Sequence, residues 1–155
     1  MVHNKYMKVY LAADHAGFNL KEEIKKFLIG KGYEVEDCGA FSFEKGDDYP
    51  DFIVKAAEKV SQDQDSKGIV FGKSGTGEEI VANKIRNIRA FAGVDEENVR
   101  LAREHNNANI LSLGSEFVDF EKAKRFVKIF LNTPFSKEPR HQRRIEEIQK
   151  IEDRQ

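Results

Sequence analysis

Residues 67–84, KGIVFGKSGTGEEIVANK, decide the fold, because an apolar run, a glycine-rich turn and a helical pattern follow one another there. Residues 68–71 are apolar and bounded by breakers, which is typical of a strand buried on both faces of a parallel sheet. Gly72, Gly75 and Gly77 then permit a sharp turn and let a ligand approach main-chain N–H groups closely. We therefore expect this turn to bind an anion.

Two adjacent glutamates open the predicted helix, and their spacing separates them. Thr76 and Glu79 have the spacing of a capping box, so we expect Glu79 to help begin the helix on its solvated side. Glu78 shares the inward-facing stripe with Val81 and Ile85. A carboxylate on that stripe is costly unless it has a function, although it could also simply complement the helix dipole.

Composition limits the classes of protein that the chain can be. With 155 residues, 39% of them hydrophobic and 34% charged, the chain fits one compact domain over residues 1–155. The net charge of −1 and the absence of Lys or Arg runs favour a small-molecule ligand over nucleic acid. No apolar stretch approaches membrane-spanning length and no signal-peptide pattern is present, so a cytoplasmic protein is expected. A single cysteine, Cys38, excludes an internal disulfide and is expected to be a reduced, half-buried thiol.

Strand and helix patterns alternate along the whole chain after a loose segment at residues 1–6. Strands are predicted at residues 8–13, 33–37, 68–71, 89–93 and 109–114. Helices are predicted at residues 18–30, 50–60, 76–86, 95–104, 119–131 and 138–152. Strands that alternate with helices predict a parallel sheet covered on both faces, which is a three-layer α/β/α sandwich.

Asp14 and His15 follow directly after the first strand. Open α/β sheets bind ligands beyond the carboxyl ends of their strands, so both are candidate site residues. Two structural roles are also open: Asp14 as a helix cap and His15 as a loop side chain.

His105 comes just before the fifth strand, which places it at the amino edge of a parallel sheet. Asp14 and the glycine turn lie at the carboxyl edge instead. If His105 belongs to the same site, a two-fold partner must supply it, which predicts a symmetric oligomer. Otherwise His105 is a helix-end histidine that interacts with the dipole.

Arg140 and Arg144 lie on one side of the last helix, close to its amino terminus. Two guanidiniums repel each other and the positive end of the dipole there. A bound phosphate would relieve both repulsions, whereas the alternative is a basic patch paired with surface carboxylates.

The sequence does not match the common motifs for nucleotide or metal binding. GKSGTG lacks the spacing of a phosphate-binding P-loop, because only three residues separate Gly68 from Gly72, and the dinucleotide fingerprint fails at Ile80. The four histidines show no pair at metal-ligand spacing. We expect chemistry with no cofactor and no metal.

Five motifs in order carry a resemblance to a known family. They are AADHAGF at 12–18, DYPDF at 48–52, GIVFGKSGTGEEIVANK at 68–84, REHNNANILSLGS at 103–115 and RHQRRIEEI at 140–148. Together they resemble the type B ribose-5-phosphate isomerases, a family that includes the galactose-6-phosphate isomerase subunits. The resemblance implies a Rossmann-like sheet of order 2-1-3-5-4, a homodimer with shared active sites and metal-free aldose–ketose isomerisation in the pentose phosphate pathway.

The resemblance also implies roles for individual residues. One branch of the family uses a cysteine at the position of Gly72 as the base, and the other uses a glutamate at the position of Glu78, which this chain has. Ser74 and the N–H groups of Gly75, Thr76 and Gly77 would stabilise the enediolate. The remaining matches are His105 with Asp14 for ring opening, Asn106 and Tyr49 for sugar binding, and His15, Arg140 and Arg144 for phosphate binding.

One position departs from the family pattern. Where many members have an arginine on the phosphate after the fifth strand, this chain has Glu116, and a carboxylate there repels a phosphate dianion unless it turns away. A six-carbon aldose phosphate, such as allose or galactose 6-phosphate, is therefore an alternative substrate. A non-catalytic sugar-phosphate-binding subunit is a second alternative, and pairing of dimers into tetramers stays open.

Overall fold

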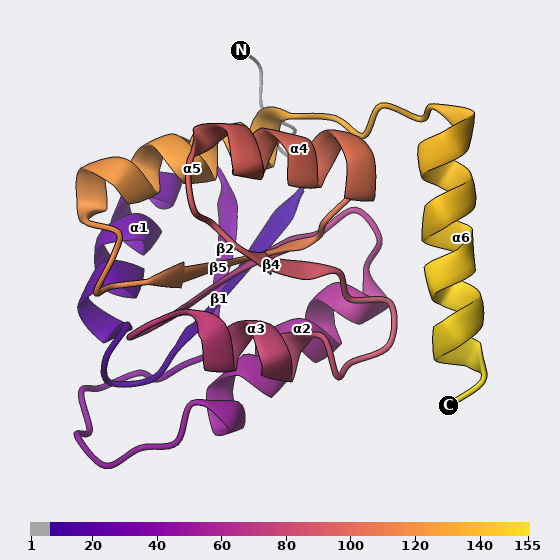
Figure 1. The fold of residues 1–155 in the computed structure, drawn as a ribbon. Coiled ribbons are helices and arrows are strands. Elements are labelled where there is room, and N and C mark those ends of the chain that lie inside the picture. The colour runs from indigo at the N-terminus through magenta and orange to yellow at the C-terminus, as the bar shows by residue number, and fades with distance from the viewer. Residues whose placement is uncertain (1–6) are drawn as a thin grey trace.

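The computed structural model describes residues 7–155, so the predicted loose segment at 1–6 lies outside the described residues. Five parallel strands form one sheet in the order β2-β1-β3-β5-β4 (Figure 1). The strands are β1 (Lys8–Ala13), β2 (Glu34–Asp37), β3 (Lys67–Gly72), β4 (Ala90–Ala92) and β5 (Ile110–Gly114). Both the predicted fold class and the predicted strand order are confirmed.

Helices cover both faces of the sheet. They are α1 (Phe18–Gly30), α2 (Pro50–Gln62), α3 (Thr76–Ala82), α4 (Glu96–Asn106), α5 (Phe120–Asn132) and α6 (Pro139–Asp153). Helices α1, α4 and α5 pack on one face, and α2 and α3 pack on the other (Figure 1). Among residues 7–155, no helix is both long enough and apolar enough to cross a membrane.

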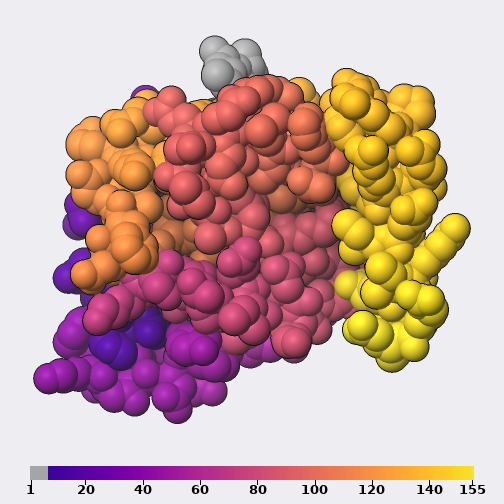
Figure 2. Space-filling model, viewed as in Figure 1, coloured from indigo at the N-terminus to yellow at the C-terminus, as the bar shows by residue number. Residues whose placement is uncertain are grey.

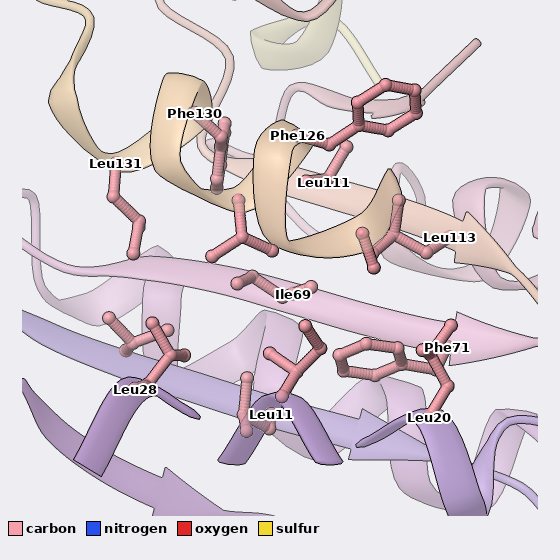
Figure 3. Close-up of a cluster of buried hydrophobic side chains, with 14 of the residues drawn as sticks. Leu11, Leu20, Leu28, Ile69, Phe71, Leu111, Leu113, Phe126, Phe130 and Leu131 are labelled. Atoms are coloured by element: carbon pink, nitrogen blue, oxygen red, sulfur yellow. The ribbon is translucent and has the colours of Figure 1, made fainter. Parts of the chain in front are cut away.

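The core lies on both sides of the central strands because their side chains alternate between the two faces. Leu11, Ile69 and Leu111 meet α1 and α5 on one side, where Phe126 and Phe130 complete the cluster (Figure 3). Tyr10, Val70 and Ile110 face α2 and α3 on the other side, where Ile53, Ala57 and Ala82 are buried with them. Each fully buried Leu, Ile or Phe contributes about 2 kcal/mol, so the central strands are the most firmly held part of the fold.

The third helix differs from the prediction at both ends. The predicted capping box is wrong: Gly75, with a left-handed φ of 82°, is the N-cap, and no side chain caps the helix. Because the chain enters the helix only after this turn, Thr76 is its first residue. The helix also ends at Ala82 rather than near residue 86, since the Asn83 side chain bonds to the backbone N–H and C=O of Ala90 at 2.8 and 2.9 Å.

Helix α6 stands beside the sandwich rather than in one of its layers (Figure 1), and it forms a ridge along one side of the surface in Figure 2. An ion pair of 2.6 Å joins Arg86 to Asp153, and the N–H of Asn87 donates to Glu152 at 2.7 Å. Near the start of the helix, the ring of His141 is buried. The helix is therefore held at its two ends.

Candidate active site

Glu78 folds back over the end of the central strand. A Cβ atom built on Gly72 would lie 1.8 Å from Oε1 of Glu78, so the carboxyl group occupies the space that any side chain at 72 would need. Glu78 is 3% exposed, and among the described residues its Oε2 has no hydrogen-bond partner. The predicted inward orientation of Glu78 is confirmed, and the site has a free carboxylate oxygen.

The electrostatic surroundings make this carboxylate a stronger base than usual. Burial raises the pKa of Glu78 above its ordinary value, and the nearby Asp14 carboxylate raises it further. Backbone N–H groups of Glu78 and Gly75 act in the opposite direction. A carboxylate with a raised pKa and an unused oxygen is suited to taking a proton from carbon.

The turn that precedes Glu78 is held by contacts from other elements. Ser112 donates its hydroxyl to the carbonyl of Gly75 at 2.7 Å, and the hydroxyl of Ser74 accepts the N–H of Thr76 at 3.2 Å. The ring of Tyr49 lies against Gly77, where an added Cβ would come within 2.6 Å of it. Ser74, Thr76 and Tyr49 thus lie at the same turn as Glu78.

Asp14 is buried at the junction between β1 and α1. Its Oδ1 accepts the N–H groups of Ala16 and Gly17 at 3.0 and 3.2 Å, so it shapes the turn that leads into α1. Its charge also acts on Glu78, whose pKa it raises. The helix-cap alternative for Asp14 is wrong, because Gly17 is the N-cap of α1 and no side chain caps this helix. A role in the site stays a prediction.

His15 is paired with a residue that the sequence analysis did not single out. Its Nδ1 lies 2.6 Å from Oδ1 of Asp47, and its backbone N–H donates to the same oxygen at 3.0 Å. With Asp14, these two residues form a group whose possible ligand atoms lie within 4.8 Å of one another. The hydrogen bond to Asp47 occupies Nδ1, so that nitrogen is not available to a metal ion. An acidic turn in the sequence, GDDYP, was the only signal for Asp47.

The ends of three strands meet at this edge. A Cβ at Gly17 would lie 2.4 Å from the carbonyl carbon of Phe71, and a Cβ at Gly114 would lie 2.4 Å from the carbonyl oxygen of Ser74. Ser115 donates its hydroxyl to the carbonyl of Ala16 at 3.0 Å. We call the group of candidate residues here the strand-end cluster; it consists of Asp14, His15, Tyr49, Ser74, Gly75, Thr76, Gly77 and Glu78.

The other candidate residues form a second group, the helix-corner cluster of His105, Asn106, Arg140 and Arg144. His105 and Asn106 lie in the last turn of α4, which agrees with the prediction that this helix runs to about residue 104 and ends at residues 105–107. The His105 ring lies 4.2 Å from that of His141 between centroids, and His141 shares a 2.9 Å hydrogen bond with Ser136. Burial and the neighbouring His105 lower the pKa of His141. This corner is the contact between α4 and α6.

The arginines of this corner face solvent. Arg140 is paired with Glu138 at 2.9 Å, which agrees with the surface-patch alternative for that residue, and Arg144 is exposed. In a parallel sheet, α4 must end at the amino edge because β5 begins there. Figure 1 shows this separation: the arrow of β5 points to one side of the view, and α6 stands at the opposite side. One chain does not bring the two clusters together.

Two further residues were discussed from the sequence. Cys38 is buried, and burial together with Glu36 raises the pKa of its thiol to about 11, which disfavours the reactive thiolate. Glu116 is exposed, and its backbone N–H donates to the carbonyl of Lys73 at 3.0 Å, next to the glycine turn. Glu116 therefore borders the candidate site, as its sequence position implied.

A parallel sheet of this order, with a buried carboxylate on the glycine turn after its central strand, defines a Rossmann-like α/β protein with a candidate site at the carboxyl ends of its strands. The chain belongs to the Ribose/Galactose Isomerase family, whose sequence model matches residues 9–148. Ribose-5-phosphate isomerase B of Mycolicibacterium paratuberculosis is 47% identical over 94% of this chain and 92% of its own. The Escherichia coli protein of the same name is 38% identical over 95% of the length of this chain and 97% of its own length.

Solved structures agree with this assignment. Ribose-5-phosphate isomerase B of Clostridium thermocellum has a TM-score of 0.91 at 41% identity, covering 96% of this chain and 99% of its own. The Mycoplasma genitalium enzyme with bound ribulose 5-phosphate has a TM-score of 0.92 at 38% identity. The match covers 96% of this chain and 98% of that enzyme's chain. The resemblance found in the sequence is confirmed.

Proposed function

We propose that this chain interconverts ribose 5-phosphate and ribulose 5-phosphate through an enediolate, without a cofactor. The observation that carries this proposal is the Glu78 carboxylate, which is buried, unpaired at one oxygen and held against Gly72 at the glycine turn. Relatives named ribose-5-phosphate isomerase B, one of them with bound ribulose 5-phosphate, support the choice of substrate.

Glu78 acts as the base in this mechanism. It takes the proton from C2 of the open-chain aldose, and the electron pair of that C–H bond moves toward the C1 carbonyl to form the enediolate. A proton also shifts from the C2 hydroxyl to the oxygen on C1. Glu78 then returns its proton to C1, which gives the ketose and restores the enzyme. A placed base of this kind contributes about 100-fold or more to the rate.

The glycine turn stabilises the enediolate. The N–H groups of Gly75, Thr76 and Gly77 stand at the turn that carries Glu78, and Ser74 adds a hydroxyl that can move protons between the two oxygens. Each preorganised donor to a developing oxyanion contributes on the order of 3 kcal/mol. Tyr49, packed on Gly77, limits the pocket at this point.

Ring opening and substrate binding also need the helix-corner cluster, which lies too far from Glu78 of the same copy of the chain. We assign ring opening to His105 with Asp14, sugar binding to Asn106, and phosphate binding to His15, Arg140 and Arg144. Because the helix-corner cluster lies at the opposite edge of the sheet, a second copy must contribute it. A homodimer with two shared sites satisfies this requirement for both copies by symmetry.

A coupled assay for ribulose 5-phosphate formation tests the function. Glu78→Gln keeps the shape of the side chain but cannot accept the proton, so turnover should fall by roughly 100-fold or more while sugar-phosphate binding persists. Glu79→Gln is the matched control, since the neighbouring carboxyl lies on the more exposed side of α3 and should be dispensable. An active Glu78→Gln enzyme would refute the assignment.

The same substitution should stabilise the fold. The pKa of Glu78 is higher in the folded state than in the unfolded state, where it is 4.5. The free energy of unfolding therefore falls as the pH rises from 4.5 through the pKa of the folded state. Glu78→Gln removes this loss and should raise the free energy of unfolding at pH 7 relative to pH 4. Urea unfolding at pH 4 and pH 7 measures both effects.

A six-carbon aldose phosphate is a second candidate substrate, and Glu116 favours it. An exposed carboxylate beside the glycine turn disfavours a phosphate in its immediate neighbourhood, and a longer sugar would place the phosphate elsewhere. Comparison of kcat/KM across ribose, allose and galactose phosphates decides between the two substrates. Binding without conversion of any of them would indicate a non-catalytic subunit instead.

A further inference from the structure

Asp47 connects two parts of the strand-end cluster that are distant in sequence. It lies in the loop between β2 and α2, 32 residues from His15, and its side chain is 10% exposed. Its Oδ1 accepts the backbone N–H of His15 and faces the ring Nδ1 at 2.6 Å. Within residues 7–155, no other hydrogen bond joins a side chain of loop 41–48 to the β1–α1 junction.

This contact determines which nitrogen of His15 carries a proton. An ionised carboxylate only accepts hydrogen bonds, so Nδ1 must be the protonated nitrogen. Nε2, which has no hydrogen-bond partner among the described residues, is then left for a ligand. Phe43 limits rotation of the ring by an edge-on contact at 6.1 Å between centroids, and the His15 side chain remains 31% exposed.

Two carboxylates lie beside the ring of His15. Asp47 Oδ2 is buried without a hydrogen-bond partner, and Oδ2 of Asp14 lies 4.0 Å from Nδ1. No lysine or arginine within residues 7–155 forms an ion pair with either carboxylate. The His15 ring is therefore the nearest side-chain donor available to both of them.

We propose that Asp47 is a positioning residue that fixes the tautomer and orientation of His15. It holds Nδ1–H, so that Nε2 faces the substrate's phosphate and donates to it when this nitrogen also carries a proton. The phosphate contact rests on the proposed function above; the tautomer does not. A neutral Nδ1–H ring could only accept at Nε2, whereas a phosphate dianion requires a donor there. Asp47 thus acts on the substrate through His15.

The tautomer is tested by ¹⁵N NMR of the histidine rings, with the His15 signals assigned from a His15→Gln sample. In the wild-type chain, the neutral His15 ring should be the Nδ1–H tautomer. Asp47→Asn retains an oxygen acceptor and should keep this tautomer, while Asp47→Ala should lose it. A wild-type ring in the Nε2–H form, or no change in Asp47→Ala, would overturn the proposal.

Phosphate binding and kinetics test the second part of the proposal, which is the contact between His15 Nε2 and the phosphate. Asp47→Asn removes the charge but not the shape, so the affinity for inorganic phosphate should fall, and KM for ribose 5-phosphate should rise, by about tenfold, with kcat changed less than about twofold. Asp48→Asn, at the exposed neighbouring aspartate, is the matched control and should change neither value.

A double variant separates positioning from loop stability. If Asp47 acts through His15, adding Asp47→Asn to His15→Gln should cause no further loss of phosphate affinity. An equal loss in the presence and absence of His15 would contradict the proposal. If the wild-type chain bound phosphate but isomerised no sugar, the proposed function would fail, while the tautomer and phosphate results would still stand.

Discussion

The strand-end and helix-corner clusters differ in how the fold treats them. Glu78 and Asp14 are buried, and the glycines at 17, 72, 77 and 114 leave no room for a side chain. Asn106, Arg140 and Arg144 are exposed at the corner where the start of α6 meets the end of α4. Burial gives the strand-end cluster a stronger base. Exposure leaves the helix-corner cluster accessible to a second chain, so the two clusters have complementary properties.

The largest expected effect comes from recombining the two clusters. Glu78→Gln disables the strand-end cluster and His105→Asn disables the helix-corner cluster, so each variant alone should be inactive. Heterodimers of the two, purified through two different tags, contain one site with both groups intact and should regain about half of the wild-type activity. The coupled assay on tandem-purified protein measures this recovery.

Two results would contradict the shared site. Heterodimers that co-purify but stay as inactive as their parents would show that the clusters do not act together across copies. Activity of His105→Asn alone would remove the helix-corner cluster from the reaction. Each parent variant purified through both of its tags provides the background.

A smaller effect is expected where close packing within the strand-end cluster is disturbed. Gly72→Ala places a Cβ 1.8 Å from Oε1 of Glu78 and must displace the carboxyl group. We expect kcat to fall by about 100-fold, with a change of less than about 1 kcal/mol in the free energy of unfolding, because the displaced atoms end a flexible side chain. Gly30→Ala, where nothing lies within 4 Å, is the control. Full activity of Gly72→Ala would show that this position of Glu78 is not required.

The smallest effect is a shift in pH dependence. Burial, and after it the Asp14 carboxylate, raises the pKa of Glu78, so the acid limb of kcat/KM should lie above pH 4.5. Asp14→Asn keeps the hydrogen-bond acceptor and removes the charge, which should move this limb to lower pH. The profile is measured from ribulose 5-phosphate, an open-chain substrate that needs no ring opening. A limb that stays in place or moves to higher pH would contradict this influence of Asp14.

Sequence patterns were most informative where a property depends on neighbours a few residues apart. Strand alternation and helical spacing predicted five strands, six helices and the inward side of Glu78, and widely spaced motifs predicted the family and the strand order. Element ends were less accurate, as the early end of α3 shows, because Asn83 binds the backbone of Ala90 across a turn. The proposed capping box failed for a similar reason, since the left-handed backbone of Gly75 delays the helix.

The sequence by itself determined the parallel α/β sandwich, the glycine turn and the inward side of Glu78, because these follow from local periodicity and residue type. The role of Glu78 as the base is implied by the resemblance to the family. Only the tertiary structure decided that the Glu78 carboxyl fills the space above Gly72 and that Asp47 lies within hydrogen-bond distance of the His15 ring. It also placed His141 against His105 at the far corner. Such contacts depend on how strands and loops distant in the chain align, and spacing within one segment carries no information about that alignment.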